Sequence, residues 1–95
     1  MDFDNTTHKV IIDSLNLDEA KACIEFLLAE RARHIKNIDE IEYEVVCINA
    51  VIPLNVNRAH WQALKEFWES AIKRHEEDIA DIDKLVEMVK DRFKI

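Results

Sequence analysis

Two series of mainly apolar residues, one on each side of Pro53, dominate the pattern of this chain. In both, the spacing alternates between three and four residues, with one slip in the second series, and this is the seam spacing of a coiled coil. The first series comprises Ile24, Leu27, Arg31, His34, Ile38, Ile41, Val45, Ile48 and Ile52. The second comprises Trp61, Leu64, Trp68, Ile72, His75, Ile79, Ile82, Val86, Val89 and Phe93. The pattern predicts two long helices that pack antiparallel as a hairpin.

Capping and helix-breaking residues give the expected bounds of the two helices. Asn16 can cap a helix whose first turn carries two acidic residues, so the first helix is expected to begin at residue 17. Pro53 disfavours the helical conformation for the residue before it. We therefore expect helices over residues 17–52 and 58–93, joined by a turn over residues 53–57.

Two segments contain enough β-branched residues to form strands. Residues 8–13 include Val10, Ile11 and Ile12 between polar neighbours, which predicts a short strand within an N-terminal arm over residues 1–16. A lone strand has no partner inside a helical hairpin, so it would pair with another subunit or lie as an extended arm. Residues 43–52 are also rich in β-formers, but the seam spacing continues through them and favours a helix.

The composition favours a single domain over residues 1–95 with few, long elements. The chain has 95 residues, of which 48% are hydrophobic and 35% are charged, as in long helices with one exposed face. Glycine is absent and proline occurs once, so tight hairpin turns, phosphate-binding loops and glycine helix caps are not expected. The predicted fold class is therefore mainly all-α.

Charge and hydropathy limit the expected partners. The chain carries 20 acidic and 13 basic residues, a net charge of −7, which disfavours direct binding to nucleic acid. No stretch approaches the roughly 20 apolar residues that span a bilayer, so no membrane contact is expected.

Cys23 and Cys47 would lie about 36 Å apart in one helix, too far for a disulfide. We expect reduced thiols and a cytoplasmic location, or the host cytoplasm if the chain is viral.

A polar layer interrupts the middle of the apolar seam. With the turn as the centre of the hairpin, His34 falls opposite His75, and Arg31 falls opposite Asp78 and could pair with it. Isolated polar residues in a seam fix register and orientation at a cost in stability, and this is the favoured interpretation. Two imidazoles near the carboxylates of Glu30, Asp78 or Glu76 could also bind a divalent metal ion or respond to pH. The sequence does not require either role, so no metal and no cofactor is assigned.

A second apolar set lies outside the seam. Its members are Phe26, Leu28, Ile35, Val46, Phe67, Leu85 and Met88. Two helices cannot cover this much apolar surface, so we expect two hairpins to pair as a homodimer that forms a four-helix bundle. The alternative is a surface reserved for another protein.

Apolar and aromatic residues also gather around the turn. The candidate interaction residues there are Leu54, Val56, Trp61, Phe67 and Trp68. Aromatic side chains concentrate binding energy at protein interfaces, which makes this end of the hairpin a candidate binding tip. Because Trp61 and Trp68 also have seam spacing, packing in the core is the competing interpretation.

No motif in the chain predicts catalysis. Without glycine there is no nucleophile elbow or Walker loop, and Ser14 and Ser70 lack a base and an orienting group, so an enzyme is not expected. We expect a protein-interaction module, an accessory, regulatory or inhibitory protein that docks on a larger protein. One alternative is an acidic mimic of DNA, of the kind that phages encode, and another is a metal-binding helical bundle. The acidic face of such a mimic would include Glu76, Glu77, Asp81 and Asp83.

Overall fold

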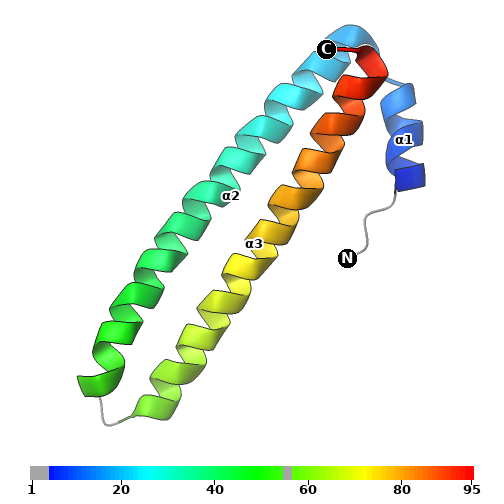
Figure 1. The fold of residues 1–95 in the computed structure, drawn as a ribbon. Helices are drawn as coiled ribbons and strands as arrows, with labels where there is room; N and C mark the ends of the chain where they lie inside the picture. The colour runs from blue at the N-terminus through cyan, green and yellow to red at the C-terminus, as the bar shows by residue number, and fades with distance from the viewer. Residues whose placement is uncertain (1–4, 55–56) are drawn as a thin grey trace. The chain divides into compact units, whose positions relative to one another are not determined.

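The computed structural model describes residues 5–54 and 57–95, and these residues form an all-α helical hairpin with a short preceding helix (Figure 1). The elements are α1 (Asn5–Asp13), α2 (Leu17–Val51), the 3-10 helix η1 (Ile52–Leu54) and α3 (Arg58–Phe93). The predicted pair of long helices is confirmed, with the first ending one residue earlier than expected. Residues 43–51 are helical, as the seam spacing indicated.

The expected strand or extended arm over residues 8–13 is wrong, because these residues belong to α1. His8, Ile11, Ile12 and Leu15 recur at intervals of three and four residues, and all four line one cavity beside Val89 of α3. This interval places side chains on one face of a helix. Burial of Ile12, which is 6% exposed, outweighs the modest strand preference of the β-branched residues, which depends strongly on context.

Tertiary contacts divide the chain into two compact units, and both long helices contribute to each. Unit 1 comprises residues 1–32 and 79–95, and unit 2 comprises residues 33–78. Within each unit a segment of α2 packs antiparallel to a segment of α3 (Figure 1). The expectation of a single domain over the whole chain stays a prediction.

Unit 1 has a core to which three helices contribute. Its buried residues are Ile12 from α1, Ala20 and Ile24 from α2, and Val86 and Val89 from α3. Partly buried residues pack around them, namely Cys23, Leu27, Ile82, Met88 and Phe93. The short helix α1 thus covers apolar surface that the two long helices leave open in this unit.

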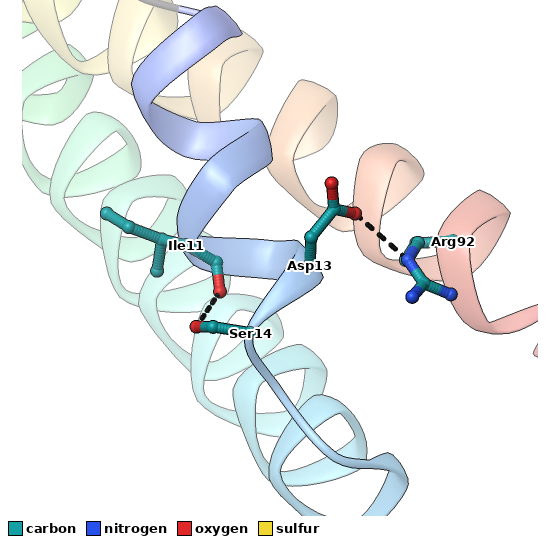
Figure 2. Close-up of polar contacts among 4 residues, drawn as sticks. All are labelled: Ile11, Asp13, Ser14 and Arg92. Atoms are coloured by element: carbon teal, nitrogen blue, oxygen red, sulfur yellow. Dashed lines mark hydrogen bonds and ion pairs between the residues drawn. The ribbon is translucent and has the colours of Figure 1, made fainter.

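One ion pair joins the end of α1 to α3, and one local hydrogen bond lies at the end of α1 itself (Figure 2). Arg92 Nε donates a hydrogen bond to Asp13 Oδ1 at 2.9 Å, and Ser14 Oγ donates to the carbonyl oxygen of Ile11 at 2.6 Å. The side chains of Asp13 and Arg92 are both about half exposed, so the ion pair contributes at most about 1 kcal/mol. Apolar burial at Ile12 is therefore the larger contribution to docking of α1.

Side chains cap the first turns of both long helices. The backbone N–H of Glu19 donates to Asn16 Oδ1 at 2.8 Å, and the backbone N–H of Asn16 donates to Glu19 Oε1 at 3.0 Å. These reciprocal bonds form a capping box, which confirms the predicted start of the first long helix. At the second, the N–H of His60 donates to Asn57 Oδ1 at 3.4 Å.

Helix α3 ends in a left-handed cap although the chain contains no glycine. Lys94 follows Phe93 with φ of 54°, and the N–H of Ile95 donates to the carbonyl oxygen of Lys90 at 3.2 Å. This six-residue closure is the pattern of a Schellman motif, in which glycine is the usual left-handed residue. The absence of glycine therefore did not exclude this kind of helix end.

We predict that Ile12→Ala lowers the free energy of unfolding by about 2–4 kcal/mol, because it removes a buried side chain at the contact of α1 with α2 and α3. Urea denaturation followed by circular dichroism measures the change. Ile11→Ala is the matched control, since Ile11 is 55% exposed whereas Ile12 is 6% exposed. Equal losses for the two variants would contradict this packing of α1.

Candidate functional site

The polar layer of unit 2 is formed by one histidine from each long helix. His34 of α2 and His75 of α3 are both half-buried, and their Nδ1 atoms lie 2.8 Å apart. The ring centroids are 5.0 Å apart and the ring planes are inclined by 57°. The predicted register, with these two residues opposite each other, is therefore confirmed. Ile41 of α2 and Trp68 of α3 line one cavity together with His75.

The short distance between the two nitrogens restricts where hydrogen sits. At 2.8 Å the contact is a hydrogen bond, which needs one Nδ1 that carries hydrogen and one that offers a lone pair. If both rings carried hydrogen on Nδ1, two donors would meet and the hydrogen bond between the rings could not form. The pair therefore shares one hydrogen, which one Nδ1 donates and the lone pair of the other Nδ1 accepts.

A carboxylate completes a three-residue cluster. Asp78 follows His75 by three residues on α3, and side chains at that spacing are neighbours on a helix surface. Each of His34, His75 and Asp78 offers a potential ligand atom, and these three atoms all lie within 4.8 Å of one another. Asp78 is exposed, so the carboxylate forms the solvent side of the cluster. We refer to these residues as the His-His-Asp cluster.

Arg31 does not make the expected pair with Asp78. Its Nε donates instead to Asp83 Oδ1 at 2.8 Å, within unit 1. A flexible arginine side chain reaches along the neighbouring helix to a carboxylate that simple register counting does not place opposite it. Both side chains are partly exposed, so the pair contributes at most about 1 kcal/mol. Of the predicted polar layer, the residues within unit 2 are those of the His-His-Asp cluster.

The candidate residues of the binding tip separate into half-buried and exposed groups. Trp61 and Trp68 are half-buried, as expected for seam positions. Leu54 is 86% exposed and Phe67 is 55% exposed. The ring of Phe67 meets that of Trp68 edge-on, with centroids 5.3 Å apart. Val56 lies outside the described residues.

Phe67 occupies a shallow groove on α3 that the sequence did not reveal as a unit. Its neighbours along the groove are the small residues Ala63 and Ser70. The groove is also lined by the charged residues Glu66, Lys73, Arg74 and Glu77. We call these seven residues the Phe67 face. The ring stands between small side chains, and two acidic residues balance two basic ones.

The acidic residues proposed for a DNA mimic divide into two groups, Glu76 and Glu77 in unit 2 and Asp81 and Asp83 in unit 1. Glu76 and Glu77 are exposed but consecutive, so they point about 100° apart around α3. Asp83 is engaged by Arg31, and Asp81 is half-buried. The basic residues Lys73 and Arg74 precede the acidic pair along the helix, separated from it by His75.

Comparisons with protein-family models, with curated proteins and with solved structures find no match for the chain. Among the described residues, no helix is both long and apolar enough to cross a bilayer. A functional proposal for this chain therefore depends on its own surfaces and side-chain clusters.

We predict a favourable coupling of about 0.5–1.5 kcal/mol between His34 and His75, the usual net contribution of one hydrogen bond. A double-mutant cycle with His34→Ala and His75→Ala, measured by urea denaturation in a metal chelator, gives this value. A parallel cycle of His34→Ala with His60→Ala serves as the control, because His60 is exposed near the start of α3. Additive effects in the first cycle would exclude the bond between the rings.

Proposed function

We propose that the protein is a helical protein-interaction module that docks on a larger protein as an accessory, regulatory or inhibitory subunit. The observation that carries this proposal is the apolar surface of unit 2. Among its described residues, only Ile48 and Ala71 are buried. Its large apolar side chains that remain exposed are Ile35, Tyr43, Val46, Leu54 and Phe67.

The energy of apolar burial makes this surface favourable for association. A large apolar side chain contributes about 1.5–3 kcal/mol when it moves from water to a buried position. Large contiguous apolar patches are rare on monomers and are common where another protein binds. Unit 1 uses α1 to cover part of its apolar surface. In the described part of unit 2, the 3-10 helix η1 is the third element, and it has no buried residue.

The Phe67 face is suited to a second copy of this chain. Glu66 and Arg74 stand four residues before and four residues after Ser70. If two α3 helices cross antiparallel at Ser70, a two-fold axis places Glu66 of each copy opposite Arg74 of the other. The small Ser70 side chain permits close approach, and Phe67 packs beside the crossing. We therefore propose a homodimer in which four long helices form a bundle.

A larger partner would use apolar residues that this crossing leaves open. Ile35, Tyr43 and Val46 are exposed on α2, and Leu54 is exposed in η1. Tyr43 combines a large apolar ring with a polar hydroxyl, a combination enriched at protein interfaces. We place the docking surface on these four residues.

The two free cysteines suit a reducing compartment, and we propose that docking takes place in the cytoplasm.

The charge pattern makes the Phe67 dimer directly testable. Glu66→Arg and Arg74→Glu each place like charges opposite each other twice per dimer, and we expect each to raise the dimer dissociation constant about 10-fold, which is about 1.4 kcal/mol. The double variant Glu66→Arg with Arg74→Glu restores opposite charges and should restore association. Sedimentation velocity over a dilution series measures all three.

Glu87→Arg is the control for net charge, because Glu87 is exposed on α3 in unit 1. It should leave the dissociation constant unchanged. A wild-type chain that stays monomeric, or a double variant that associates no better than the single variants, would contradict this dimer.

Docking on a larger protein is tested by Tyr43→Ala against Phe26→Ala. Both aromatic residues are exposed on α2, at 69% and 64%, but Tyr43 is in unit 2 and Phe26 in unit 1. With a partner isolated by affinity purification, we expect Tyr43→Ala to weaken binding about 10- to 100-fold, since a buried aromatic anchor is a typical hot spot. Phe26→Ala should bind like the wild type.

Salt dependence distinguishes this function from DNA mimicry. Binding through apolar residues persists in high salt, whereas binding through an acidic face weakens because exposed charges are screened. A dissociation constant that stays about the same when NaCl is raised to about 0.5 M supports docking through apolar residues. Loss of binding in salt, together with loss in Glu76→Gln and Glu77→Gln, would favour the mimic.

A further inference from the structure

We propose that His34, His75 and Asp78 bind one divalent transition-metal ion, of which Zn²⁺ is the reference case. The two imidazoles come from different helices of unit 2 and the carboxylate from the helix that carries His75. Their potential ligand atoms all lie within 4.8 Å of one another. This inference is independent of the proposed docking surface, because none of the three residues belongs to that surface or to the Phe67 face.

The donor atoms select the class of ion. Imidazole nitrogen suits zinc, copper, iron and nickel ions, whereas Ca²⁺ and Mg²⁺ prefer sites built of oxygen. A set of two nitrogens and one carboxylate oxygen leaves one tetrahedral position for water, as in zinc sites that keep an open coordination position. The cluster therefore fits a borderline transition-metal ion better than a hard cation.

The distances in the cluster allow an ion to enter with small side-chain movements. Zinc–nitrogen bonds of about 2.0–2.1 Å in a tetrahedron place two ligand nitrogens about 3.4 Å apart. The two Nδ1 atoms lie at 2.8 Å, so they would separate by roughly half an ångström as the hydrogen between them moves to Nε2 of its own ring, through solvent, and the ion takes its place. The exposed Asp78 carboxylate would move inward, through side-chain rotation alone.

The surroundings favour a positive ion at this place. The half-buried position of both rings limits their alternative contacts with water, and the exposed carboxylate gives the ion a route from solvent. The chain carries a net charge of −7, which attracts cations. Because a bound ion would link α2 to α3 inside unit 2, where few residues are buried, it would stabilise the unit that has the smaller core.

The test uses the full chain after treatment with a chelator, titrated with ZnCl₂ in a calorimeter. We expect one Zn²⁺ per chain and an upward shift of the urea midpoint in Zn²⁺, because the ion binds the folded chain preferentially. His34→Ala and Asp78→Asn should each lower the affinity at least about 10-fold. Asp78 is exposed, so Asp78→Asn keeps the fold if His34→Ala does not.

Two matched variants control for non-specific binding. His60→Ala removes an exposed histidine of the same unit, and Asp81→Asn removes the next aspartate along α3. Both variants should bind Zn²⁺ with the affinity of the wild type. Co²⁺ gives an independent readout, since strong visible absorption marks a low-coordinate site and should vanish in Asp78→Asn. Absence of saturable binding, unchanged affinity in Asp78→Asn, or equal loss in His60→Ala would each overturn the proposal.

Discussion

Two helices can bury only the stripe along which they touch, and the organisation of both units depends on this constraint. In unit 1 the stripe is widened by α1, which adds Ile12 to Ala20, Ile24, Val86 and Val89. In the described part of unit 2 the same two helices bury only Ile48 and Ala71. The apolar residues that remain exposed in unit 2 are the physical basis for the proposed association.

The same constraint explains why a polar cluster can exist at a seam position. A residue between two helices is half-buried rather than enclosed, so His34 and His75 lose only part of their contact with water. Their mutual hydrogen bond offsets some of that loss. The exposed Asp78 then stands close enough to make the cluster a site for an ion as well as a marker of register.

Several features followed directly from residue types and spacing. Asn16 caps the first long helix as the sequence predicts, and the structure adds the reciprocal bond from Asn16 to Glu19. The facing of His34 and His75 follows from equal numbers of residues on each side of a short turn. Both predictions depend on local geometry or on simple counting along regular helices, and neither needs knowledge of packing.

Other features depended on contacts that spacing does not reveal. Residues 8–13 are rich in β-branched residues, which favours a strand, but their apolar spacing also fits a helix. They form a helix, in which Ile12 is buried. Arg31 pairs with Asp83 because a long side chain selects among several carboxylates within reach. Ala63, Phe67, Ser70 and Arg74 have helical spacing, but the structure shows that they line one groove.

The sequence by itself determined the two long helices, their antiparallel register and the polar interruption of their seam, because helical periodicity and caps are local properties. Only the tertiary structure decided that α1 is a helix packed on unit 1 and that Asp78 joins the two histidines. It also decided which apolar residues stay exposed in unit 2. These outcomes result from competition among non-local contacts, whose free energies depend on which surfaces meet when the chain folds.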